Sequence, residues 1–132
     1  MHGLHLTADL DGCPAGLALM GDADALRRCC LGAVAAAGLQ TVGTLFHRFE
    51  RTPPATTAAP QGVTGVVLLA ESHLAVHTWP ERGSVTLDVY VCNFGGDNSA
   101  RAQQLLDTLL AAFAPARVER HVLVRGAAER MA

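Results

Sequence analysis

Hydrophobic and polar residues alternate most regularly between positions 84 and 92. The apolar positions are Val85, Leu87, Val89 and Val91, and the positions between them are Thr86, Asp88, Tyr90 and Cys92. Side chains of an extended strand point alternately to its two faces. The segment is therefore predicted to be a strand with one face in the core and with Cys92 on the other, more polar face.

Five further segments have the composition of strands. Residues 3–10 alternate in part and end at the turn pair Asp11-Gly12, and residues 63–70 form one continuous apolar run. The other three are residues 41–50, which are rich in β-branched and aromatic side chains, residues 72–79 and the closing segment 117–125. The stretch 51–60 contains three prolines and is predicted to be an exposed loop.

Two segments show the spacing of amphipathic helices. Asp22 is the predicted cap of the first helix, which runs to about residue 37 and ends at Gly38. Asp97 or Asn98 caps the second helix, which runs to about residue 114 and is stopped by Pro115. Their apolar residues recur every three or four positions. These stripes are Leu26, Cys30, Ala33 or Val34, and Ala37 in the first helix, and Ala102, Leu105, Leu106, Leu109 and Phe113 in the second.

The predicted order of elements is β-α-β-β-β-β-α-β, with short connections between the middle strands. This order favours a mostly antiparallel sheet with both helices on one face, which is an α+β, two-layer sandwich. A chain of 132 residues has the length of one domain, so residues 1–132 are predicted to form a single domain. Because helices cover only one face, the other face of the sheet is left for solvent or for a partner.

Composition narrows the classes of function. The ten basic residues are all arginine, so chemistry that needs a lysine amine is excluded. The arginines are scattered and are outnumbered by twelve acidic residues, which argues against a nucleic-acid-binding protein. The N-terminal residues lack a secretory signal, and the longest weakly polar stretch, residues 31–39, is too short to cross a membrane. We therefore predict a cytoplasmic protein that binds neither nucleic acid nor membrane.

The densest group of reactive side chains lies between residues 71 and 81. A metal site there would combine His73 and His77 with one of the glutamates, Glu71 or Glu81. It would require a helix, because along a strand the four-residue spacing separates the two histidines by about 13 Å. A serine hydrolase with Ser72 as nucleophile would be expected to carry the G-x-S-x-G elbow, which is absent. Neither a metal ion nor hydrolase chemistry is predicted.

A third interpretation comes from the order of residues in this region. Residues 62–81 read GVTGVVLLAESHLAVHTWPE and are followed by VTLDVYVC at residues 85–92. This sequence resembles the core of the bacterial S-adenosylmethionine decarboxylases, and the ESH and HTWPE strings are its most specific parts. A weaker resemblance extends to residues 3–6, to FHRF at residues 46–49 and to the closing strand. It therefore covers most of the chain.

Members of that family are made as proenzymes that cut themselves at a Glu-Ser bond and convert the serine into a pyruvoyl group. For this chain the resemblance implies a cut between Glu71 and Ser72, which gives a β chain of residues 1–71 and an α chain of residues 72–132. The pyruvoyl ketone takes the place of pyridoxal phosphate and forms the Schiff base with the substrate amine. The absence of lysine agrees with this chemistry, because the carbonyl group is generated from Ser72.

The resemblance also implies two residues for the self-cleavage. Thr64 occupies the position of a hydroxyl that donates a hydrogen bond to the oxyanion formed during the cut. Many members have serine there, so threonine is a conservative departure. His77 matches the base that removes the α-proton of residue 72 and so completes the conversion. His73, next to the cut, is given no catalytic role.

Three further residues are implied for the mature enzyme. Cys92 matches the proton donor that acts after CO₂ has left, Glu81 matches the carboxylate that binds the ribose hydroxyls, and Phe49 matches the ring that stacks on adenine. The predicted reaction converts S-adenosylmethionine to CO₂ and the decarboxylated aminopropyl donor of spermidine and polyamine biosynthesis. The predicted enzyme is therefore a pyruvoyl-dependent carboxy-lyase.

Two alternatives to this function stay open. The same pyruvoyl chemistry could act on a basic amino acid, L-arginine or L-ornithine, with the pocket changed in residues 51–60 or 93–97. A non-catalytic relative could instead serve as a regulatory subunit, although Ser72, His77 and Cys92 are all present. The family resemblance and the free face of the sheet together predict a homodimer of αβ protomers.

Overall fold

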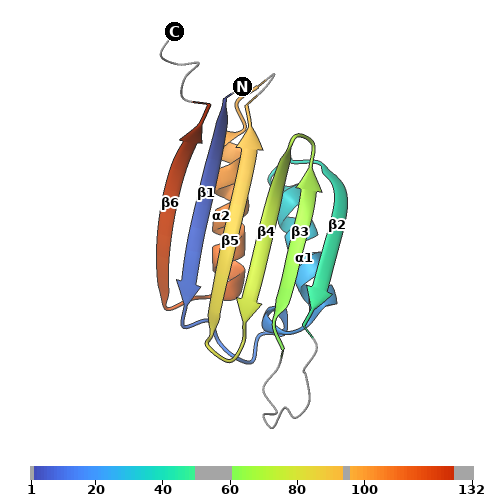
Figure 1. Ribbon diagram of the computed structural model, residues 1–132, viewed down its shortest axis with the longest axis vertical. Coiled ribbons are helices and arrows are strands. Elements are labelled where there is room, and N and C mark those ends of the chain that lie inside the picture. Colours follow the sequence, from blue (N-terminus) through green and yellow to red (C-terminus); the bar gives the residue numbers. More distant parts are fainter. Residues whose placement is uncertain (1, 50–60, 94–95, 127–132) are drawn as a thin grey trace.

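The computed structural model describes residues 2–49, 61–93 and 96–126 (Figure 1). Its strands are β1 (Gly3–Asp11), β2 (Thr41–Arg48), β3 (Val63–Leu69), β4 (Ser72–Trp79), β5 (Ser84–Cys92) and β6 (Arg117–Arg125). Its helices are the short 3-10 helix η1 (Ala18–Met20) and the α-helices α1 (Ala23–Ala36) and α2 (Ser99–Phe113). No helix within these ranges is long and apolar enough to span a membrane. The loop predicted at residues 51–60 lies outside the described residues.

The strands form one sheet in the order β2-β3-β4-β5-β1-β6, and every pair of neighbours is antiparallel. Strands β3, β4 and β5 follow one another as hairpins, whereas β1 lies between β5 and β6 (Figure 1). This arrangement confirms the predicted element order and the predicted α+β sandwich. Among the described strands the sheet is antiparallel throughout.

Three strand ends differ by one or two residues from the prediction. β1 extends to Asp11, because Asp11 still pairs with Arg117 of β6. β2 ends at Arg48 instead of residue 50. β3 ends at Leu69, because Leu69 pairs directly with Ser72 and leaves the two residues between them to form the turn. The last difference matters for function, since this turn contains the predicted cleavage site.

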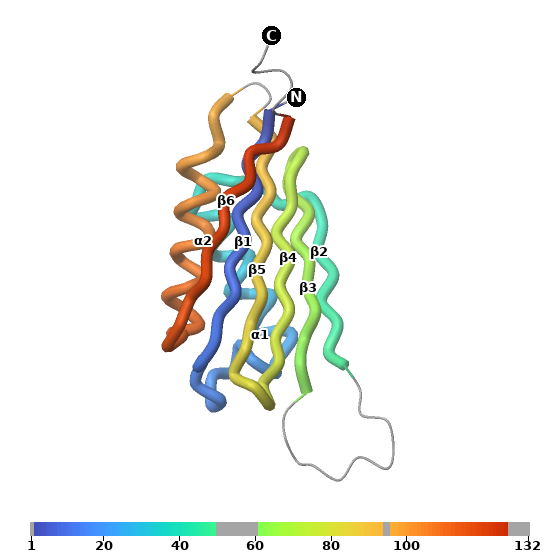
Figure 2. Tube along the Cα trace, turned by 60° about the vertical axis from the view of Figure 1, so that its left-hand side comes forward, coloured from blue at the N-terminus to red at the C-terminus, as the bar shows by residue number. Residues whose placement is uncertain are grey.

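Both α-helices lie against the same face of the sheet (Figure 2). Asp22 caps α1 as predicted, because its carboxylate accepts hydrogen bonds from the N–H groups of Asp24 and Ala25 at 3.0 and 3.1 Å. The predicted apolar stripes are the surfaces that the helices bury. Their buried members are Leu26, Cys30, Ala33 and Val34 in α1, and Ala102, Leu105, Leu106, Leu109 and Phe113 in α2.

The core fills the space between the helices and the sheet. In the central strands every second residue points toward the helices and is almost completely buried, as Leu6, Leu74 and Val89 are. The residues between them form the opposite surface, which we call the open face. Large apolar side chains lie on the β2–β4 side of the open face. They are Leu45, Leu68 and Trp79, whose exposed fractions are 70%, 50% and 38%.

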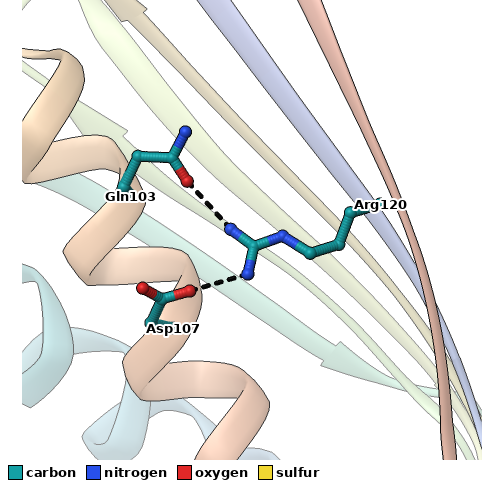
Figure 3. A network of polar contacts seen from close by, with 3 residues as sticks. All are labelled: Gln103, Asp107 and Arg120. Carbon is teal, nitrogen blue, oxygen red and sulfur yellow. Dashed lines mark hydrogen bonds and ion pairs between the residues drawn. The ribbon is translucent and has the colours of Figure 1, made fainter.

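Strand β6, at one edge of the sheet, is joined to α2 by a polar contact (Figure 3). The guanidinium group of Arg120 donates hydrogen bonds to the Asp107 carboxylate and to the Gln103 side-chain oxygen, each 2.8 Å long. Arg120 pairs with the buried Ala8 of β1, so its side chain is on the helix side of the sheet. An exposed ion pair contributes little to stability, but this one joins the last strand to the layer of helices.

Candidate active site

The turn between β3 and β4 contains the predicted scissile peptide. It consists of Ala70 and Glu71, and Ser72 begins β4. The φ angle of Glu71 is 62°, in the left-handed region. For a residue with a β-carbon this conformation costs about 1–2 kcal/mol, and such strain is characteristic of functional sites. The backbone is therefore strained at Glu71, whose carbonyl group is the one that Ser72 would attack in the predicted cleavage.

The Ser72 hydroxyl is in direct contact with the end of β5. The backbone N–H of Cys92 donates a hydrogen bond of 3.2 Å to Ser72 Oγ. Cys92 is the last residue of β5, and both side chains are half-buried. The structure thus brings together Glu71, Ser72 and Cys92, which we call the cleavage-site group.

A second pair of predicted residues lies on adjacent strands of the open face. Thr64 on β3 is directly opposite His77 on β4, and a hydrogen bond of 3.1 Å joins Thr64 Oγ1 to His77 Nδ1. The rings of His77 and Trp79 are 6.0 Å apart and tilted by 31°. This pairing confines the imidazole from two sides, which suits a group that must transfer a proton at a fixed position.

These two sets of residues do not meet within one chain. His77 follows Ser72 by five residues along the extended strand β4, and this separation corresponds to about 16 Å at about 3.3 Å per residue. Thr64 is paired with His77 and lies equally far along β3. Neither side chain of the same chain can therefore touch the Glu71–Ser72 peptide.

The two predicted substrate-binding residues lie near Thr64 and His77. Glu81 is exposed in the turn that follows β4, two residues after Trp79. Phe49 comes directly after β2; it is 48% exposed, and its ring meets that of His47 edge-on at 5.6 Å. His47 is the register partner of Thr64 on β2. We call Thr64, His77, Glu81 and Phe49 the distal group, because it occupies the end of the sheet away from Ser72.

His73, which has no predicted role, belongs to a cluster of rings on the open face. It is directly opposite Tyr90, and Tyr90 is opposite His5 on β1. The ring centroids of His73 and Tyr90 are 5.7 Å apart, and His5 Nε2 lies 3.1 Å from the Asp88 carboxylate. The regular alternation of β5 identified Asp88 and Tyr90 as open-face residues, but only the register shows which strands they meet. Within the described ranges no three histidine, cysteine or acidic side chains gather as a metal site.

Thr78 lies inside the HTWPE string, but the sequence pattern did not identify it as a functional residue. It is 1% exposed and points to the helix side. Its hydroxyl donates a hydrogen bond of 2.8 Å to the backbone oxygen of Met20 and accepts one of 2.9 Å from the N–H of Val63. Thr78 therefore fixes β4 to β3 and to η1 beside His77. One signal in the sequence could have revealed it. Thr78 lies between the aromatic side chains of His77 and Trp79 and alternates with the apolar residues Leu74 and Val76, so it is a polar residue on the buried face of the strand.

The four cysteines differ in their surroundings. Burial raises the pKa of the Cys30 thiol to about 12 and also raises the pKa of the Cys29 thiol. The pKa of Cys13 is raised as well, first by burial and then by the neighbouring carboxylate of Asp11. Cys92 differs from these three in lying on the open face, next to Ser72.

Comparison with curated proteins gives a consistent set of relatives. The S-adenosylmethionine decarboxylase proenzyme of Aquifex aeolicus is 39% identical over 127 residues, which are 96% of this chain and 83% of the relative. The proenzyme of the same name from Persephonella marina is 36% identical over 124 residues, which are 94% of this chain and 82% of the relative. That from Thermococcus onnurineus is 34% identical over 112 residues, or 85% of this chain and 72% of the relative.

Solved structures agree with this relationship. The adenosylmethionine decarboxylase of Aquifex aeolicus matches with a TM-score of 0.76 at 36% identity, over 92% of this chain and 88% of that one. A Trypanosoma brucei AdoMetDC monomer shares the fold at 13% identity and a TM-score of 0.55, over 90% of this chain and 45% of that one. The model of the S-adenosylmethionine decarboxylase family matches residues 4–126. This chain therefore belongs to the S-adenosylmethionine decarboxylase family.

Proposed function

We propose that this chain cuts itself between Glu71 and Ser72, converts Ser72 into a pyruvoyl group and then decarboxylates S-adenosylmethionine. The observation that carries the proposal is the hydrogen bond from the Cys92 N–H to Ser72 Oγ, directly after the left-handed Glu71. Proenzymes of the same family at 34–39% identity over most of the chain support it. Their name also favours S-adenosylmethionine over a basic amino acid.

The self-cleavage can be written with groups that the chain itself supplies. Ser72 Oγ attacks the carbonyl carbon of Glu71, and collapse of the oxyanion breaks the C–N bond, so the peptide becomes an ester. A base then removes the α-proton of residue 72. The Cβ–Oγ bond breaks, Glu71 leaves as a carboxylate, and the resulting dehydroalanine tautomerises to an imine. Water hydrolyses the imine, ammonia departs, and a ketone remains at residue 72.

The distal group supplies the donor and the base for these steps. The Thr64 hydroxyl would stabilise the oxyanion, and the His77 imidazole would take the α-proton. Their mutual hydrogen bond aligns the two side chains. Because both lie about 16 Å from Ser72 in their own chain, we propose that they act on the Ser72 of a second copy.

A homodimer built on the open face satisfies this requirement. If two open faces stack about a twofold axis with their strands antiparallel, the distal group of one protomer meets the cleavage-site group of the other. Stacking would also remove Leu45, Leu68 and Trp79 from water, and these side chains are now 38–70% exposed. The proposed assembly is therefore a dimer of αβ protomers with two composite sites.

In the mature enzyme the pyruvoyl group would supply the carbonyl that captures the substrate amine and draws electrons from the departing carboxylate. The chain's own residues would do the rest. Cys92 would return a proton to the substrate carbon, and Glu81 and Phe49 would bind the ribose hydroxyls and the adenine ring. The half-exposed ring of Phe49 and the exposed carboxylate of Glu81 are both accessible for such contacts.

Electrophoresis and mass spectrometry of the purified protein test the proposal. We expect chains of 71 and 61 residues, the second with an N-terminal pyruvoyl group, and we expect Ser72→Ala to stay whole. Thr108→Ala, at an exposed position of α2 in the layer of helices, is the control and should still be cut. Release of CO₂ from S-adenosylmethionine, and none from L-arginine or L-ornithine, would identify the substrate. A wild-type protein that never cleaves would overturn the proposal.

A further inference from the structure

Asn98 is the residue immediately before α2, but its side chain does not cap the helix. Asparagine at this position normally caps a helix by accepting a backbone N–H hydrogen bond, yet the Asn98 side chain makes no such bond. Its Nδ2 instead donates a hydrogen bond of 3.0 Å to the backbone oxygen of Cys92, and its Oδ1 accepts one of 2.9 Å from Arg101. The carboxylate of Asp97, not the side chain of Asn98, accepts a hydrogen bond from the backbone N–H of Ser99.

A second hydrogen bond, to Asn93, ties Asn98 to the end of β5. The backbone N–H of Asn98 donates to Asn93 Oδ1 at 2.8 Å, and the N–H of Asn93 donates to the backbone oxygen of His2 at 2.7 Å. The residue after Cys92 is thereby connected both to the residue that precedes α2 and to His2, the residue that precedes β1. Asn93 and Asn98 together hold the chain on the C-terminal side of Cys92.

The two peptide groups that flank Cys92 are consequently both fixed. The preceding peptide is held through the Cys92 N–H on Ser72 Oγ, and the following one through the Cys92 oxygen on Asn98 Nδ2. Two fixed peptide planes determine the position of the Cα atom between them and the direction of its side chain. Without the Asn98 bond, the peptide after Cys92 is held only through the Asn93 N–H on the His2 oxygen, and the position of Cys92 relative to residue 72 is less tightly fixed.

We propose that Asn98 is a positioning residue, which holds Cys92 against residue 72 during self-cleavage and decarboxylation. This inference rests on the proposed function and extends it to a side chain that does not touch the reacting atoms. Misplacement of a reacting group by about 1 Å can cost a hundredfold in rate. Loss of one hydrogen bond to Cys92 should therefore slow the chemistry without removing it.

Asn98→Asp tests this role, because it has the same shape but carries no N–H donor. Aspartate is also a favourable residue at a helix N-terminus, so the melting temperature should be unchanged or higher. We expect self-cleavage to slow about tenfold, and kcat of the processed enzyme to fall similarly while KM stays the same. Asn98→Ser keeps the capping ability but does not reach Cys92. Asn98→Ser should slow cleavage and lower kcat as Asn98→Asp does. If Asn98→Asp melts at a lower temperature than the wild type, the rates of Asn98→Ser decide whether Asn98 positions Cys92.

The pH dependence separates positioning from a structural role. When the carboxylate introduced by Asn98→Asp takes up a proton, it regains a donor for the Cys92 oxygen. Because a carboxyl group of this kind takes up its proton only near pH 4, the rate of Asn98→Asp relative to wild type should stay low from pH 8 to about pH 5 and rise as the pH falls toward about 4. The neighbouring titratable and charged groups are Arg101, Asp97 and His2, which are present in both proteins, and Arg101 is the one in direct contact with the side chain of residue 98. A ratio that does not change with pH would count against the proposal.

Arg101→Gln is the control, since it removes the other hydrogen bond of the Asn98 side chain and leaves the one to Cys92. It should cleave at close to the wild-type rate. The inference would be overturned if Asn98→Asp cleaved itself at the wild-type rate, or if self-cleavage of Arg101→Gln slowed as much as that of Asn98→Asp. Failure of the wild type itself to cleave in the same assay would refute the proposed function instead.

Discussion

Thr64 Oγ1 and His77 Nδ1 are joined by a hydrogen bond of 3.1 Å between two paired strands. The bond depends on the hydroxyl alone, so Thr64→Val should preserve the shape of the side chain and abolish the interaction. Loss of an oxyanion donor costs about 10²–10³ in rate, and we expect self-cleavage to slow by that order. Thr64→Ser retains the hydroxyl and is the matched control. The rate of appearance of the two chains on a denaturing gel measures both, and rapid cleavage of Thr64→Val would remove Thr64 from the mechanism.

Complementation between two inactive variants distinguishes action within a chain from action across a dimer. Ser72→Ala retains His77 but has nothing to cut, and His77→Ala retains Ser72 but lacks the proposed base. When the two are co-expressed with different tags, a composite site predicts that the His77→Ala chain is cleaved in mixed dimers. Each variant expressed alone should stay whole, and the Ser72→Ala chain should stay whole in both cases. If the mixed dimers form and neither chain is cut, the two groups do not act in trans.

The left-handed backbone at Glu71 predicts opposite effects on stability and on cleavage. Glycine adopts a φ of 62° without the steric cost that a β-carbon imposes. In a Ser72→Ala background, which keeps the chain whole, Glu71→Gly should raise the free energy of unfolding by about 0.5–1 kcal/mol. In the wild-type background the same change should slow self-cleavage, because the relieved turn no longer presents a strained carbonyl. Urea denaturation and the cleavage assay check the two effects separately.

Thr78 offers a test of how the HTWPE segment is anchored. Thr78→Val would leave the backbone oxygen of Met20 and the N–H of Val63 buried without their partner. An unsatisfied buried group costs about 1–3 kcal/mol, so we expect a loss of about 2–4 kcal/mol in urea denaturation of the uncleaved Ser72→Ala protein. Thr44→Val, on an exposed position of β2, should change stability by less than about 0.5 kcal/mol. Equal stability of the two variants would contradict the anchoring role.

The fold could be predicted from sequence because its main signals are periodic. The alternation in β5 and the stripes of α1 and α2 directly reflect which side chains face the core, and Asp22 and Pro115 mark the beginning of one helix and the end of the other. Strand ends have no such periodic signal, because they depend on pairing partners. Leu69 ends β3 only because it pairs with Ser72.

The contacts within the candidate site could not be predicted from the sequence. The ESH and HTWPE strings are only three residues apart in the sequence, and the family resemblance implies that Ser72 and His77 act in one place. Extended geometry instead separates them by about 16 Å, while the fold brings Cys92, twenty residues downstream, into contact with Ser72. Contacts of this kind depend on strand register and on loops such as the one around Asn98. Residue type alone does not encode them.

The start of α2 provides a prediction about acid stability. The pKa of Asp97 is lowered from its usual 3.8, chiefly because its carboxylate accepts a hydrogen bond from the Ser99 N–H, and also through the Ser99 hydroxyl and the nearby His2. A carboxyl group whose pKa is lower in the folded state stabilises the fold above the unfolded pKa, and this stabilisation disappears as the pH falls through the folded pKa. Asp97→Ala in the Ser72→Ala background should therefore melt at a lower temperature than its parent at neutral pH. The difference should stay constant down to about pH 5 and vanish below about pH 3. Thermal melts across this range measure it, and a difference that grows on acidification would show that Asp97 is not the group responsible.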